Sequence, residues 1–183
     1  MRTMFKVAAL LLAASPVAAQ MPSGYAGEQT REIKSLSPQE QADLLAGRGM
    51  GLARAGELNH YPGPAHVLEL RSRLNLSPEQ IVAIGSSLRQ MQGTAKPLGA
   101  ELVARERALD TAFREGTMTP ARLEADTAMI GALQGRLRAT HLAAHIEMRS
   151  ALTAAQITTY DALRGYTDAS APPAGHQHYM APG

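Results

Sequence analysis

Two similar stretches of sequence, Leu152-Thr153-Ala154-Ala155-Gln156 and the upstream Leu76-Ser77-Pro78-Glu79-Gln80, decide the fold of this chain. Each is typical of a helix start, because the hydroxyl of Thr or Ser can cap the first turn while the glutamine reaches back to the N–H of the capping residue. The leucine before each cap can pack on an isoleucine one turn into the helix. Pro78 suits the first helical position, where a missing N–H costs nothing. The sequence therefore predicts that one helix begins after Ser77 and another after Thr153.

Two long helices are predicted between these boxes, one from Pro78 to about Glu115 and one from its cap Thr119 to about Ser150. Apolar residues recur along both at helical spacing, which is typical of helices that pack along a narrow seam against an antiparallel neighbour. The seam positions are Ile81, Ile84, Leu88, Met91, Ala95, Leu98, Leu102, Leu109 and Phe113 in the first helix, and Leu123, Thr127, Ile130, Leu137, His141, Ala144 and Met148 in the second.

Shorter helices are predicted on either side of this hairpin, one over 65–74 and a last one from Thr153 to about Leu163. Pro97 lies inside the first long helix and predicts a bend near Gly93. We therefore predict an all-α fold, a bent antiparallel helical hairpin of four to five helices with no strands. Because such a hairpin is too thin to bury both seams alone, we expect a homodimer.

The ends of the chain differ in composition from its middle. Residues 1–19 resemble a cleavable signal peptide, with Arg2 and Lys6 before a short apolar core and small residues before Gln20. We therefore expect export to the periplasm. The other segments expected are a flexible polar stretch over 20–35, a glycine-rich helix over 36–61 that opens at a capping box on Ser37, the helical core over 62–166, and a disordered tail over 167–183.

Charge and composition narrow the classes of partner. The chain has 18 Lys and Arg against 16 Asp and Glu. Arg2 and Lys6 account for that excess, so the exported chain is formally neutral, which argues against nucleic acid or an anionic membrane as a partner. No apolar run after the signal peptide is long enough for a membrane span. The absence of cysteine leaves helix packing, without disulfides, to supply the stability.

Together, the two L-[ST]-x-x-Q boxes around a long hairpin, the signal peptide and the lack of cysteine resemble the Spy/CpxP family of periplasmic stress proteins, known by its LTxxQ motif. The resemblance covers roughly 65–166. It implies an all-α fold with four helices and a cradle-shaped antiparallel dimer. It also implies an ATP-independent chaperone for unfolded clients, or an accessory factor that acts on a sensor protein of the envelope. The motif residues are Leu76, Ser77, Gln80, Leu152, Thr153 and Gln156.

A histidine pair carries the strongest chemical signal. His141 and His145 lie one turn apart, so both imidazoles can reach one metal ion, and Met148 continues that face. Two imidazoles and a thioether suit zinc, copper, nickel or cobalt. The metal-responsive ZraP- and CnrX-type relatives also use an N-terminal histidine pair, for which this chain offers only His60 and His66. The alternative is that His141 and His145 bind no metal. We also expect the tail residues His176, His178 and Met180 to bind none.

No catalytic motif is recognisable, and we expect a non-enzymatic protein. The chain has no cysteine nucleophile, and Leu142 stands where the zinc-protease motif H-E-x-x-H needs its glutamate. The glycines over 47–56 lack the Lys-Ser/Thr pair of a phosphate loop and more often permit close backbone contact or flexibility. Three hypotheses follow: a client-holding chaperone or stress accessory protein that needs no cofactor, a metal-responsive protein that uses the histidine pair, and a structural adaptor.

Overall fold

The structure is a computed structural model that describes residues 23–166. The predicted signal peptide over 1–19 and the predicted tail over 167–183 lie outside the described residues. The chain divides after Thr30 into two compact units. The described part of the first unit contains one short 3-10 helix, η1 (Glu28–Thr30).

The second unit is all-helical, as predicted, and no strand occurs anywhere in 23–166. It has six α-helices between Arg31 and Tyr166, one more than the highest number predicted. The helices are α1 (Pro38–Ala46), α2 (Arg54–Glu57), α3 (Pro64–Glu69), α4 (Pro78–Arg114), α5 (Pro120–Ala151) and α6 (Ala154–Arg164). None of the helices in the described residues is long and apolar enough to cross a membrane.

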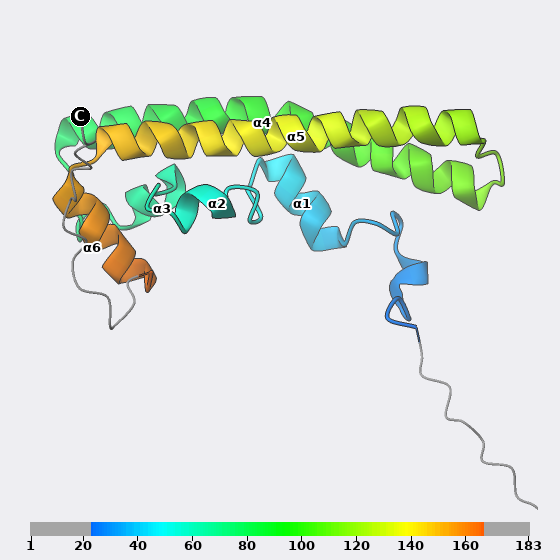
Figure 1. The fold of residues 1–183 in the computed structure, drawn as a ribbon, viewed down its shortest axis with the longest axis horizontal. Coiled ribbons are helices and arrows are strands. Elements are labelled where there is room, and N and C mark those ends of the chain that lie inside the picture. Colours follow the sequence, from blue (N-terminus) through cyan, green and yellow to red (C-terminus); the bar gives the residue numbers. More distant parts are fainter. Residues whose placement is uncertain (1–22, 167–183) are drawn as a thin grey trace, which may run out of the picture. The chain divides into compact units, whose positions relative to one another are not determined.

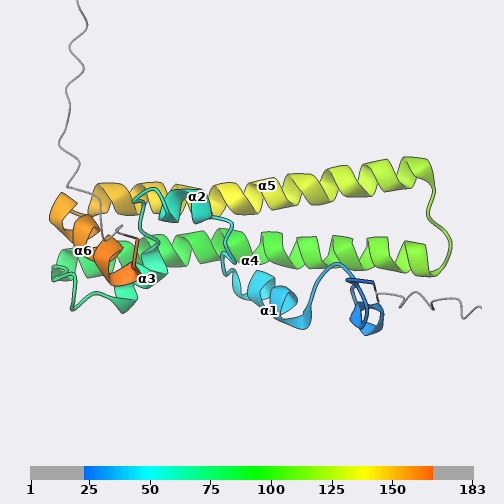
Figure 2. The ribbon, with the colours of Figure 1, turned by 60° about the horizontal axis from the view of Figure 1, so that its bottom comes forward.

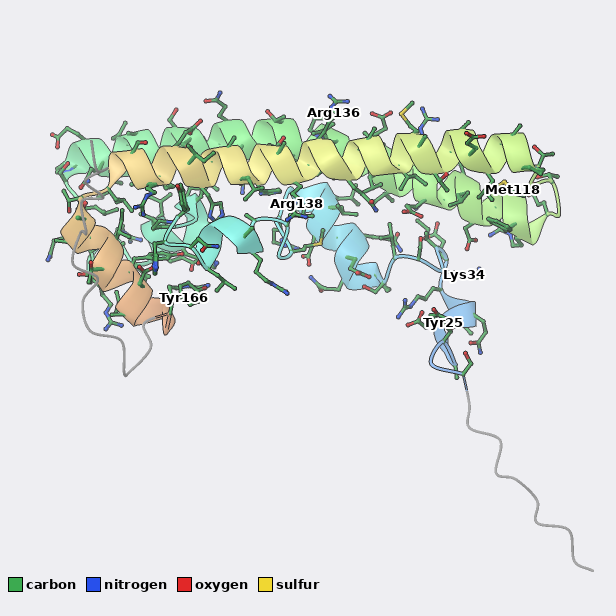
Figure 3. All side chains as sticks on the ribbon, in the orientation of Figure 1. Tyr25, Lys34, Met118, Arg136, Arg138 and Tyr166 are labelled. Atoms are coloured by element: carbon green, nitrogen blue, oxygen red, sulfur yellow. The ribbon has the colours of Figure 1, made fainter. Side chains whose placement is uncertain are left out.

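The predicted hairpin is formed by α4 and α5, which run antiparallel and side by side (Figure 2). The α4 helix is a single continuous helix through Pro97. One side of the hairpin is covered by α1, which packs on α4, by α2, which packs on α5, and by α3, which contacts both (Figure 1). Arg138 lies on this covered side, whereas Arg136 points away from the short helices (Figure 3).

The prediction of one glycine-rich helix over 36–61 is wrong beyond Ala46. The α1 helix begins at the predicted capping box of Ser37 but ends at Ala46, because Gly47 adopts a left-handed conformation (φ 68°) and caps it. Gly51 (φ 86°) continues the loop, and only the four residues of α2 are helical after it. Left-handed backbone is accessible to glycine at no steric cost, so the glycines here end a helix and build a loop.

The segment over 20–35 is likewise more ordered than expected where it precedes α1. Ile33 is completely buried in the first of two hydrophobic clusters. Ser35 donates a hydrogen bond to Glu106 of α4 (2.8 Å), and Arg107 forms an ion pair with Glu32 (2.9 Å). The part of this segment from Arg31 onward therefore packs against α4.

The two hydrophobic clusters lie at different places along the hairpin. The first joins α1 and the segment around Ile33 to the middle of α4 and α5, and the second joins α3 and α6 to the start of α4 and the end of α5. The first contains Ile33, Leu44, Ala95, Leu98, Leu102, Val103, Ile130, Leu133 and Leu137, and the second contains Val67, Leu74, Ile84, Met148, Leu152 and Tyr160. A side chain at Gly99 would collide with the backbone of Leu44, so glycine is needed there for α1 to approach α4.

Burial of both predicted seams fails at the end of the hairpin where α4 and α5 connect. Phe113 is 58% exposed near the end of α4, and Leu123 is 38% exposed near the start of α5. Their helical spacing matches the buried stripe, but nothing in the described second unit covers this end of the hairpin.

Candidate functional site

The two capping boxes that decide the fold meet each other in the structure. Ser77 caps α4 and Thr153 caps α6, each through the reciprocal pair of hydrogen bonds predicted from sequence. The Nε2 of Gln80 donates to the Oε1 of Gln156 (3.0 Å), and the Nε2 of Gln156 donates back to the Oε1 of Gln80 (3.0 Å). The boxes therefore lock two helix starts together.

Both amide groups are fully used in this arrangement. Each Oε1 also accepts from the N–H of its own cap, at 3.0 Å from Ser77 and 2.9 Å from Thr153. Each Nε2 also donates to a backbone carbonyl, Gln80 to Ala151 (2.9 Å) and Gln156 to Leu74 (3.3 Å). Each amide therefore fills its two donor and two acceptor positions, which makes this a structural joint with no group left for a ligand.

The histidine pair lies in a different place, on the covered side of α5. His141 is 3% exposed and His145 is 9% exposed. Glycines of the loops in front of them make this burial possible. A Cβ at Gly49 would lie 3.2 Å from the Nδ1 of His141, and a Cβ at Gly63 would lie 3.0 Å from the Cε1 of His145. The glycine-rich stretch thus serves close backbone contact, one of the two roles expected from sequence.

The hydrogen bond of His145 settles which of its nitrogens carries the proton. Its Nδ1 lies 2.7 Å from the backbone oxygen of Tyr61. A carbonyl oxygen only accepts, so Nδ1 is the donor, and in the neutral ring Nε2 keeps its lone pair. This is the arrangement by which proteins commonly orient a histidine for use at its other nitrogen.

His141 is held in an apolar setting. Burial, and then the nearby His145, lower the pKa of His141 below the usual value of 6.5, so the ring is neutral at neutral pH. Its Nε2 is buried and has no hydrogen-bond partner in the part of the chain that the structure describes. A buried polar atom without a partner destabilises a fold by about 1–3 kcal/mol, and such an atom is a place to look for a missing ligand.

Both imidazoles line one pocket of about 370 Å³. The loops before and after α2 form its walls, together with α4, α5 and the end of α6. His66 is the third histidine along the wall, and the methionines Met50 and Met91 also line it. Sequence reasoning missed both methionines as partners of the histidines, because one lies in a loop and the other on the neighbouring helix.

The carboxylate of Glu57 lines the pocket, is 13% exposed, and already has several partners. Tyr160 donates a hydrogen bond to the Oε1 of Glu57 (2.6 Å), and Tyr166 donates to the same atom (3.0 Å). Arg164 lies 3.5 Å from that oxygen. Burial, and then the hydrogen bond to Glu57, raise the pKa of Tyr160, which therefore remains a proton donor at neutral pH. Glu57 thus ties α2 to α6 and is not a free base.

The five ligands predicted from sequence do not converge. His141, His145 and His66 line the same pocket, whereas Met148 is 2% exposed in the second hydrophobic cluster. His60 lies outside that lining, with its Nδ1 2.7 Å from the carboxylate of Asp161. Within 23–166, no group of three or more His, Cys, Asp or Glu residues is placed to hold one metal ion. The helical face that continues from the histidine pair turns toward α3 and α6, which explains the burial of Met148.

Comparisons of this chain with models of protein families, with curated proteins and with solved structures find no match.

Proposed function

We propose that this protein is an ATP-independent chaperone or envelope-stress accessory protein of the Spy/CpxP type that works in the periplasm and holds unfolded clients on its α4–α5 hairpin. The observation that carries the proposal is that large apolar side chains stay exposed on these two helices, including Phe113 and Leu123 of the two stripes. Exposed apolar surface commonly marks a site of interaction. These side chains are Val82, Phe113, Leu123, Met129 and Ile146.

The end of the hairpin that carries Phe113 and Leu123 has the mixed chemistry that weak client binding requires. Met118 lies in the connection between α4 and α5 at this end (Figure 3), and methionine adapts its shape to varied partners. Arg114 and Arg122 flank the connection, and the stems of arginine side chains cover apolar surface while their charges stay in water. Such a surface can hold an exposed apolar segment without ATP, and a dimer would double it.

Suppression of client aggregation tests this function. With no ATP present, the protein should slow the aggregation of a chemically unfolded client. A Phe113→Ser, Leu123→Ser double variant should protect less while melting at the same temperature, because both side chains are exposed. A matched double variant at two exposed alanines of α4, Ala104→Ser and Ala108→Ser, should protect as well as the wild type.

Two results would count against the chaperone. If client aggregation proceeds unchanged in a molar excess of the wild-type protein, the protein is not a chaperone. Recovery of one stoichiometric envelope partner in a pull-down, without protection of clients, would favour the structural adaptor instead.

A second candidate function is metal response, supported by the single pocket that His141 and His145 share. Calorimetric titration with zinc, nickel, cobalt and copper tests it. Binding should be stoichiometric in the wild type and lost in the His141→Ala, His145→Ala double variant, provided that circular dichroism shows the variant to be folded. Equally tight binding by a folded double variant would exclude these residues as ligands.

A further inference from the structure

We propose that the pocket beside His141 and His145 binds a monovalent copper ion, held by the Nε2 atoms of the two histidines and the thioether of Met91. The proposal rests on the second candidate function and narrows it to one ion and three ligand residues. It excludes Met148 and His60, which the sequence suggested, because neither lines the pocket.

The two nitrogen atoms are available for different reasons. His145 donates its Nδ1–H to the Tyr61 carbonyl, which leaves the lone pair on Nε2. The Nε2 of His141 is buried without a hydrogen-bond partner in residues 23–166, so a metal–nitrogen bond would satisfy it. The two residues are one helical turn apart, which brings their rings within reach of one ion. The rings are held by tight packing against Gly49 and Gly63.

The charge of the pocket favours a monovalent ion. Glu57 is the one acidic residue in its described lining. Its Oε1 accepts from both tyrosine hydroxyls and lies near Arg164, while its Oε2 lies 3.6 Å from the Nδ1 of His145. Arg54 lines the pocket as well. A divalent cation would therefore find only one carboxylate in this lining, and Arg164 already offsets part of its charge. Zinc usually takes four ligands from Cys, His, Asp and Glu, and no three such residues are grouped for a metal in the described chain.

The third ligand, a thioether, gives the site its preference for a soft metal ion. Met91 lies half-buried on α4, across the hairpin from the histidine pair, and lines the same pocket. Thioethers bind cuprous copper in preference to harder ions, and imidazole binds copper well. Met50 also lines the pocket but is 42% exposed on a loop. A ligand on a long helix is better positioned than one on a loop, so Met91 is the thioether we assign.

Anaerobic titration of the full-length protein with Cu(I), in competition with a chromophoric chelator of known affinity, tests this assignment. The expected result is one bound ion per chain. His141→Gln should abolish competition with the chelator, and Met91→Leu should weaken binding about tenfold, a loss of about 1.4 kcal/mol. X-ray absorption should show a copper–sulfur component that Met91→Leu removes. Met50→Leu is the matched control and should leave affinity and spectrum unchanged.

Every other outcome contradicts the proposal in a recognisable way. Unchanged Cu(I) affinity in a folded Met91→Leu variant would show that the Met91 thioether is not a ligand. Loss of binding only in a His176→Ala, His178→Ala variant would transfer the ion to the C-terminal segment. Zinc or nickel bound at His141 and His145, with no Cu(I) binding, would overturn the choice of ion but leave metal response standing. No binding of any of these ions would overturn both.

Discussion

The two ends of the α4–α5 hairpin carry the same apolar repeat but differ in what surrounds it. At the base, where α4 begins and α5 ends, the stripe is covered by α3 and α6, and Tyr160 is completely buried. At the tip, where the helices connect, Phe113 is 58% exposed. In the segment before α1, Lys34 pairs with Asp110 of α4 (3.5 Å), three residues before Phe113. An apolar stripe therefore shows which face can be buried, whereas the covering elements decide how much of it is.

The base is also the polar end of the hairpin. The paired glutamines Gln80 and Gln156, the Glu57 carboxylate and the histidine pair are all held there by several partners or by close packing. Buried polar groups are destabilising when a partner is lost, while exposed apolar groups contribute little to stability. The base should thus be sensitive to single substitutions, and the tip should tolerate them.

The strongest test compares one aromatic residue from each end. Tyr160→Ala should destabilise the protein by about 3–5 kcal/mol, because it opens a cavity in the second cluster and removes a donor from Glu57. Phe113→Ala should change stability by less than about 0.5 kcal/mol, because that ring is exposed. Urea denaturation of both variants measures the difference. Comparable losses would show that the tip is covered in solution, for example by a second copy of the chain.

A double-mutant cycle on the paired glutamines tests the joint at the base. Gln80→Ala and Gln156→Ala should each destabilise by about 1–3 kcal/mol, because each leaves polar partners unsatisfied. The double variant should lose less than the sum, with a coupling of about 0.5–3 kcal/mol. Glu40→Ala is the control, because Glu40 completes the capping box of Ser37 without a partner box. Additive losses would mean that the two boxes act independently.

Threonine caps at the two ends give a smaller contrast. Thr153→Ala at the base should destabilise by about 1–2 kcal/mol, because Thr153 is part of the reciprocal box that orients Gln156. Thr119→Ala at the tip should cost about 0.5 kcal/mol, since Thr119 makes only the single bond to the N–H of Arg122. Thermal melts of the two variants measure this difference. A larger loss of stability in Thr119→Ala than in Thr153→Ala would contradict it.

The smallest expected effect concerns pH and is confined to the base. Because the pKa of His141 is lowered in the folded state, the unfolded chain binds more protons as pH falls below about 6.5. The stability linked to His141 is therefore complete above that pH and is lost on acidification. Relative to His141→Leu, the wild type should lose stability as the pH falls below about 6.5. Denaturation of chelator-treated protein across this range measures it, and parallel pH profiles would contradict the assigned shift.

The helix starts were predictable because their determinants are local. Ser37, Ser77, Thr119 and Thr153 all cap helices where the sequence places them, through bonds that span three residues. The all-helical class and the antiparallel hairpin follow from the same caps and from helical periodicity. Gly165 ends α6 by an equally local effect, because a left-handed glycine terminates a helix without help from distant residues.

The candidate site was only half visible from sequence. The spacing of His141 and His145 identified two of its residues, because helical geometry alone places them on one face. The same reasoning wrongly added Met148, which the second cluster buries, and overlooked Met91 on the opposite helix.

Sequence by itself therefore determined where α1, α4, α5 and α6 begin, which class of fold results and which histidines share a face. Tertiary structure alone decided that Gln80 meets Gln156, that Glu57 is engaged by Tyr160, and that glycines admit the loops to the imidazoles. The physical reason is distance along the chain. Capping and periodicity act within a turn or two, whereas these contacts join segments that are brought together only when the short helices pack on the hairpin.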